Sequence, residues 1–134
     1  MKILRVIVSK AGTGVSAHLP DVEGFVIARE SVEKLKRDLP AGITFHIEGL
    51  YDEERKGWMS EPLAFEYFLQ DIPTLIGGYS GLINQSSLAR ISGINESLMR
   101  QYVAGIKRPS HKVTERIESG LKKYADELRN ISFV

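Results

Sequence analysis

Two side chains in the C-terminal half carry planar hydrogen-bonding groups of the kind that recognise nucleic-acid bases. The guanidinium of Arg100 matches the major-groove edge of guanine, and the amide of Gln101 matches that of adenine. Nearby, Glu96 can accept a hydrogen bond from cytosine or be an exposed acid in a helix's first turn, and Ser97 suits a base or a phosphate. These side chains could therefore form hydrogen bonds to base edges if the fold presents them together on one exposed face.

The other polar residues give little support to catalytic or metal chemistry. Asp21 and Glu23 fall in a turn, where polar residues are common, and the acidic run at residues 52–54 is followed directly by Arg55 and Lys56. The three histidines lie far apart, without metal-ligand spacing. The expected strands lack the converging carboxylates of a metal-dependent nuclease. We therefore expect no enzyme, no catalytic residue, no metal site and no cofactor.

Two short helices must position the base-contacting groups. Asn84 is a good N-cap for a helix over residues 85–92, and Gly93 suits a left-handed helix end. Asn95 then caps a second helix, which Gly105 ends. The apolar positions expected to join the helices are Leu88, Ala89, Met99 and Tyr102, with Ile94 buried in the turn. A helix over residues 110–128, capped by Ser110, is expected to follow.

The spacing of caps, glycines and apolar residues over residues 84–109 resembles that of the helix-turn-helix of the phage-repressor (XRE) class. The matching residues are Gln85, Leu88, Ala89, Gly93, Asn95, Gly105 and Pro109. In that class the second helix enters the major groove and contacts bases from its first two turns. The resemblance thus implies base contacts from Asn95, Glu96, Ser97, Arg100 and Gln101. Phosphate contacts are expected from Gln85, Ser86, Lys107 and Arg108. An ordinary helical hairpin is the alternative.

The front half has the pattern of a small α+β domain. Strands are expected over residues 2–10, 15–19, 25–29 and 63–69. Ser31 caps a helix between the third and fourth strands, with Val32, Leu35 and Leu39 at helical spacing. We expect this helix to run, kinked, to about Gly49, with a break at Pro40 as the alternative.

A domain boundary is expected near residue 70. Asp71 is a suitable N-cap for a short helix over residues 73–80, which we assign to the DNA-binding domain. This gives a front domain of residues 1–69 and an all-α back domain of residues 70–134. Residues 1–71 have a net charge of −3 and residues 72–134 one of +4, so the basic half holds the expected DNA site.

Three segments of the front half resemble the HicB family of antitoxins. They are the opening strand with its glycine-containing hairpin, Ala-His-Leu-Pro-Asp-Val-Glu-Gly at residues 17–24, and Glu-Ser-Val-Glu-Lys-Leu at residues 30–35. The resemblance implies a β-β-β-α-β domain like a truncated ribonuclease-H fold, which binds and blocks a small RNA-cleaving toxin of the HicA type. It also implies that the C-terminal domain binds the operon's own operator as a homodimer or higher homo-oligomer.

We therefore predict an antitoxin that also represses its own operon. The alternative is a stand-alone helix-turn-helix regulator whose N-terminal domain only dimerises or binds a small ligand. No segment has the length and hydropathy of a membrane span, the N-terminus lacks a signal-peptide pattern, and there are no cysteines. These features favour a reducing cytoplasm and no membrane partner.

Overall fold

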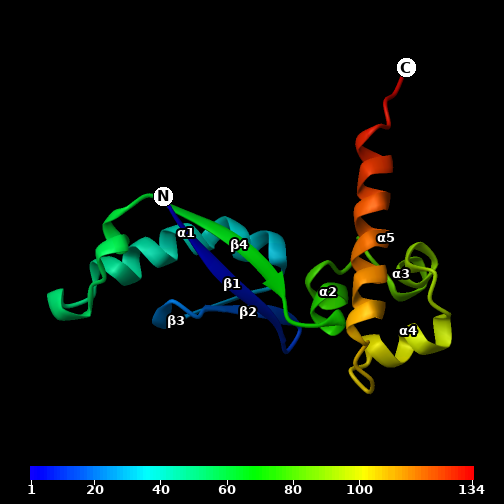
Figure 1. The fold of residues 1–134 in the computed structure, drawn as a ribbon, viewed down its shortest axis with the longest axis horizontal. Coiled ribbons are helices and arrows are strands. Elements are labelled where there is room, and N and C mark those ends of the chain that lie inside the picture. Colours follow the sequence, from blue (N-terminus) through cyan, green and yellow to red (C-terminus); the bar gives the residue numbers. More distant parts are fainter. The chain divides into compact units, whose positions relative to one another are not determined.

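The computed structural model describes all 134 residues, which form two compact units, Met1–Tyr79 and Ser80–Val134. We call them the front unit and the rear unit. The front unit is a mixed four-stranded sheet with helices, and the rear unit contains helices only (Figure 1). The chain is therefore α+β, as predicted.

The sheet of the front unit has the strand order β3-β2-β1-β4. Its strands are β1 (Lys2–Ala11), β2 (Gly14–Leu19), β3 (Val22–Arg29) and β4 (Leu63–Leu69). β1 pairs antiparallel with β2 and parallel with β4, while β3 pairs antiparallel with β2. Leu4, Val6 and Val8 alternate with more exposed residues along β1, so one face of the sheet forms the core.

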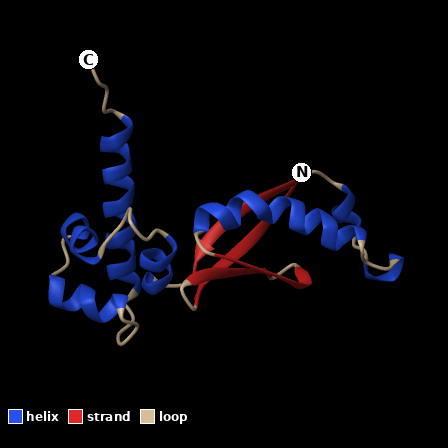
Figure 2. Ribbon diagram, turned by 180° about the vertical axis from the view of Figure 1, so that it is seen from behind, coloured by secondary structure: helices blue, strands red, loops and turns tan.

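Helix α1 (Val32–Glu48) covers that core face (Figure 2). The side chain of Ser31 caps its N-terminus by accepting a hydrogen bond from the Lys34 amide, at 3.2 Å. Pro40 lies on the exposed side of the helix, so its ring does not disturb the buried stripe, and the helix continues for two more turns. This confirms the predicted passage through Pro40. The buried side of α1 consists of Val32, Leu35, Leu39 and Ile43.

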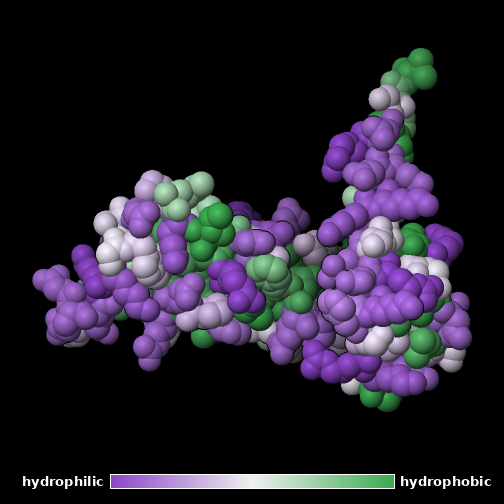
Figure 3. Space-filling view, viewed as in Figure 1, coloured by the Kyte–Doolittle hydropathy of each residue, from purple (hydrophilic) through white to green (hydrophobic).

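Between α1 and β4 the chain forms two short 3₁₀ helices, Asp52–Glu54 and Gly57–Ser60. The acidic first one lies in a strongly hydrophilic part of the surface (Figure 3). Trp58, from the second, is packed against the hydrophobic core, and the ammonium of Lys2 lies 5.4 Å from the centre of its ring. The segment between α1 and β4 thus leads the chain back to the sheet, where β4 begins beside the first residues of β1.

The short helix α2 (Ile72–Gly78) belongs to the front unit. Asp71 caps it as predicted, accepting from the Thr74 amide at 3.0 Å, and the Thr74 hydroxyl accepts a 3.0 Å hydrogen bond from the Lys10 amide of β1. Gly78 lies so close to Val32 that no side chain fits there. The chain therefore divides after Tyr79, whereas the sequence placed the boundary near residue 70 and this helix in the DNA-binding domain.

The rear unit consists of α3 (Gln85–Ser92), α4 (Glu96–Val103) and α5 (His111–Arg129). α3 packs against both of the other helices. The buried residues are Leu88, Ala89, Ser92, Ile94, Met99, Tyr102 and Ile117. The apolar stripe of α5 continues past its buried part to the half-exposed Tyr124, and the tail beyond the helix ends in hydrophobic residues (Figure 3). No helix combines the length and hydropathy needed to cross a membrane.

Candidate nucleic-acid interface

The geometry of the α3–α4 pair is set by two asparagine caps and one glycine. Asn84 accepts a hydrogen bond from the Ser87 amide at 2.9 Å, and Asn95 accepts one from the Leu98 amide at 2.7 Å. Gly93 ends α3 with φ of 66°, a left-handed conformation that favours glycine. Ile94 follows in the turn with only 8% of its surface exposed. These four features confirm the sequence-based prediction of two helices joined by a tight turn.

One side of α4 is buried and the other faces solvent. Met99 and Tyr102 are packed into the core of the rear unit. Because a helix turns once in 3.6 residues, Ser97, Arg100 and Gln101 lie together on the other side. Ser97 and Arg100 are exposed, and Gln101 is partly exposed. The three residues predicted to contact bases through this face thus form one continuous polar surface.

Of the four remaining predicted residues at these helices, all but Gln85 already form side-chain hydrogen bonds. The side-chain oxygen of Asn95 is used by the α4 cap. The Ser86 hydroxyl donates to the carboxylate of Glu96, which joins the first turns of α3 and α4. Ser86 is therefore not free to donate to a phosphate while this bond holds, and the carboxylate beside it repels one. Gln85 is partly exposed at the start of α3.

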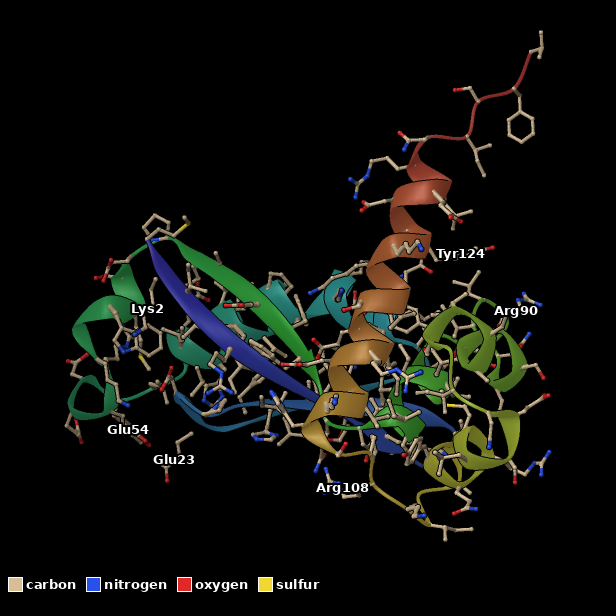
Figure 4. The ribbon with its side chains drawn as sticks, turned by 45° about the vertical axis from the view of Figure 1, so that its right-hand side comes forward. Lys2, Glu23, Glu54, Arg90, Arg108 and Tyr124 are labelled. Carbon is tan, nitrogen blue, oxygen red and sulfur yellow. The ribbon has the colours of Figure 1, made fainter.

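The three cations on α4 and in the loop after it form no ion pair. They are Arg100 on α4 and the exposed Lys107 and Arg108, which lie in the loop between α4 and α5. Figure 4 shows Arg108 projecting from this loop, well separated from Arg90 of α3. An unpaired guanidinium or ammonium can bind phosphate without first losing a partner. The charge needed for a nucleic-acid backbone is thus present beside the outer face of α4.

Two contacts from α5 that no local pattern predicts hold the α3–α4 pair in place. Arg116 donates a hydrogen bond to the carbonyl oxygen of Gly93, at the turn. Gly120 packs against the carbonyl of Ile91 so closely that a Cβ would overlap the oxygen. Arg116 and Gly120 each lie more than twenty positions from the residue they contact. The local sequence of α3 or of α5 therefore cannot predict either contact. Arg116 and Gly120 position the interface without belonging to it.

The front unit offers a second surface, the sheet face opposite α1. Ile7, His18 and Val26 are register partners on three neighbouring strands and form a row across this face. Farther along the sheet, the guanidinium of Arg5 lies 5.2 Å from the ring centre of Phe68. No helix of the front unit covers this mixture of apolar and basic side chains, because α1 occupies the other face (Figure 2). It is a candidate surface for a protein partner.

An ion pair joins the edge of the sheet to α1. Asp38 of α1 lies 2.9 Å from the guanidinium of Arg29 on β3, and it also binds Arg37. Hydrogen bonds and charge from Arg37 and Arg29 lower the pKa of Asp38 to about 2. Elsewhere in the chain, no group of three or more His, Asp or Glu residues is placed to share a metal ion.

Comparison of the chain with protein-family models, with curated proteins and with solved structures gives no match. The functional assignment must therefore come from the arrangement of the residues themselves.

Proposed function

We propose that the rear unit is a DNA-binding helix-turn-helix, with α4 as the recognition helix. The observation that carries this proposal is the division of α4 into a buried side, Met99 and Tyr102, and an outward polar surface of Ser97, Arg100 and Gln101. Arg100 would bind guanine through two hydrogen bonds and Gln101 would bind adenine in the same way. Ser97 would contact a base or the DNA backbone.

Phosphate contacts in this proposal come mainly from the loop after α4. Lys107 and Arg108 would fix the register of the helix on the duplex without reading its sequence. The rear unit carries nine basic and five acidic residues, a net charge of +4, which favours approach to DNA. Glu96 contacts Ser86 in the free protein, and it would reach a cytosine only by leaving that hydroxyl.

For the whole chain we propose an antitoxin of the HicB type that represses its own operon. The front unit has the β-β-β-α-β order that the resemblance to HicB implies, and it leaves one sheet face uncovered. That face would bind a small RNA-cleaving toxin of the HicA type and occlude its active site. A small domain that contacts DNA through one recognition helix binds weakly. The repressor would therefore act as a symmetric dimer on a palindromic operator.

The test of DNA binding starts from duplex fragments that cover the region upstream of the chain's own gene. The tagged protein should retain a specific fragment in the presence of excess unrelated DNA, and the Arg100→Ala, Gln101→Ala double variant should not. Retention of every fragment equally by both proteins would contradict the proposal.

The partner is tested by co-purification. We expect a small basic protein to co-purify in stoichiometric amount with the tagged, nuclease-treated chain from its own host, and the purified partner to lose its RNA-cleaving activity on rebinding. Recovery of the chain alone, from cells that express its neighbouring genes, would favour the stand-alone regulator instead.

A further inference from the structure

Strand β4 forms an open edge of the sheet, because it pairs with β1 on one side only. At its start, the Lys2 amide donates to the carbonyl of Pro62 at 2.9 Å, and at its end the Gln70 amide donates to a carbonyl of β1 at the same distance. In a parallel pair the peptide groups of alternate residues bond to the neighbouring strand, so those of the even-numbered residues of β4 face β1. The residues whose N–H and C=O groups point away from the sheet are therefore Leu63, Phe65, Tyr67 and Leu69.

The edge of β4 is regular. Natural edge strands are usually protected from pairing by a bulge, a proline, a charge or a covering segment. β4 pairs with β1 over seven consecutive residues without a register shift, and it contains neither proline nor glycine. Its single charge is Glu66. An antiparallel pair of two β4 strands about their midpoint would set this carboxylate against its own copy, so the edge suits a strand of a different sequence.

The core-facing side chains of β4 are only partly buried, whereas those at the centre of β1 are completely buried. Beside β4, a hollow of about 740 Å³ lies between Phe65 and the side of α1 that carries Thr44 and Ile47. Side chains alternate between the two faces of a sheet. A further strand along β4 would therefore direct every second side chain toward this hollow and cover the core-facing side chains of β4.

Charged groups without an ion-pair partner lie on both sides of this edge. On the α1 side, the ammonium of Lys36 lies 4.9 Å from the ring centre of Tyr67 and forms no ion pair. On the open face Glu66 forms none either, and the guanidinium of its register partner Arg5 lies against the ring of Phe68. The added strand that fits best thus has an acidic side chain beside Lys36 and a basic one facing Glu66.

We propose that the edge of β4 binds an extended segment of a partner protein, which adds to the sheet as a fifth strand. The segment runs antiparallel to β4, since parallel pairs are slightly less stable per residue. Its apolar side chains lie opposite Leu63 and Phe65, its acidic side chain opposite Tyr67, and its basic side chain opposite Glu66. This inference goes beyond the proposed function, which places a partner on the open sheet face only, and it does not rest on that function.

The first test uses the full-length protein and a synthetic peptide with this pattern, Thr-Val-Glu-Lys-Ile-Thr-Leu. In the antiparallel register its glutamate lies opposite Tyr67, its lysine opposite Glu66 and its isoleucine opposite Phe65. Fluorescence anisotropy of the labelled peptide should show saturable binding. A scrambled peptide of the same composition should bind about tenfold more weakly or less, because it loses the charge pairs and the apolar fit.

The second test asks whether the peptide binds through its backbone. The N–H groups of its glutamate and isoleucine face β4 in the proposed register, whereas those of its lysine and second threonine point away. N-methylation of the first pair should weaken binding by about tenfold or more, because two hydrogen bonds are lost. N-methylation of the second pair is the matched control and should have little effect.

The third test reverses the charge at the centre of the edge. Glu66 is exposed, and Glu66→Lys should weaken binding of the peptide by about fivefold. A peptide with glutamate in place of its lysine should bind this variant better than it binds the unmodified protein. Glu23→Lys makes the same change in net charge on β3, at the opposite edge of the sheet, and should leave binding unaltered. Circular dichroism checks that each variant is folded.

Three results would each overturn the proposal of a docking edge. They are no binding of the peptide, an equal loss of affinity in both N-methylated peptides, and an equal loss in Glu66→Lys and Glu23→Lys. Because the assays contain neither DNA nor a toxin, these results leave the proposed function as it stands.

Discussion

Ser97, Arg100 and Gln101 contribute to the proposed DNA interface through different groups. Arg100 brings a charge and two parallel donors, Gln101 brings one donor and one acceptor, and Ser97 brings a rotating hydroxyl. Only Arg100 and Gln101 can recognise a base through two simultaneous hydrogen bonds. Sequence specificity in this account therefore depends on Arg100 and Gln101.

Replacement of Arg100 by alanine should cost about 1–3 kcal/mol of binding free energy to the preferred duplex and relax the choice of base at one position. The measurement is fluorescence anisotropy with a set of duplexes that differ at single base pairs. Arg129→Ala is the matched control, because it removes the same charge from α5, where Arg129 pairs with Asp126. An equal loss in both variants would mean that Arg100 acts only through its charge.

Lys107→Ala should weaken binding to all duplexes by a similar factor. The loss of one phosphate contact should also reduce the slope of log affinity against log salt by about one. Titrations at several salt concentrations measure this slope, with Lys122→Ala of α5 as the control. A change in base preference, with the slope unaltered, would count against a phosphate contact.

The Asp38 carboxylate should make the front unit sensitive to acid. Its pKa of about 2 lies below the ordinary value near 3.8, so folding favours the ionised form. This contribution is complete above about pH 5 and disappears as the pH falls through 4 toward 2. Urea unfolding across this range should show a smaller loss of stability on acidification for Asp38→Asn than for the unmodified protein. Parallel pH profiles for the two proteins would contradict the assignment.

At the level of elements, the α3–α4 pair depends on the close approach of α5. A Cβ at residue 120 would overlap the Ile91 carbonyl oxygen, so α3 and α5 must separate to accept any side chain there. Gly120→Ala should therefore destabilise the rear unit by about 1–3 kcal/mol, although alanine is the better helix former. Urea unfolding followed by circular dichroism measures the change. Ser119→Ala, at an exposed neighbouring position, should unfold at the same urea concentration as the unmodified protein or a higher one.

The elements themselves were largely predictable from local sequence. Asn84, Gly93 and Asn95 act on their immediate neighbours, so their roles as caps and turn could be recognised without a structure. The three residues on the outer face of α4 follow from helical spacing alone. The sequence placed the start of the third strand at residue 25, whereas β3 begins at Val22. Val22 pairs with Leu19 directly after a tight turn, and the pairing is then irregular up to Val26, which the hydrophobic pattern does not show.

The assignment of α2 to the wrong unit has a different physical cause. Its cap at Asp71 was predicted correctly, but a cap does not determine which surface a helix packs against. That surface is determined by the bond from Lys10 to Thr74 and by the fit of Gly78 against Val32, both of which join residues far apart in the chain. The contacts of Arg116 and Gly120 were missed for the same reason. The bond between Ser86 and Glu96 likewise depends on how α3 and α4 cross.

For the molecule as a whole, the two units differ in charge and in the surfaces they expose. The front unit has a net charge of −3 and an uncovered sheet face, and the rear unit has a net charge of +4 and the polar face of α4. The net negative charge of the front unit disfavours binding to DNA. The proposed division of labour is that the front unit binds the toxin and the rear unit binds the operator.

This division predicts that the two activities can be lost separately. The Arg100→Ala, Gln101→Ala double variant should lose operator binding and still protect cells against the toxin in a growth assay. Substitution of Val26 by lysine, on the open sheet face, should have the opposite effect, because it places a further positive charge against a basic partner. Loss of both activities in a folded double variant would refute the separation.

The most direct test of the central claim, that α4 recognises DNA, is a binding isotherm for the full chain on duplex DNA from upstream of its own gene. We predict saturable binding with an affinity at least about 10³-fold higher than for a shuffled duplex, the lower range for specific recognition. This binding should disappear in the Arg100→Ala, Gln101→Ala variant. Equal affinity for the two duplexes, unchanged in the variant, would contradict the account.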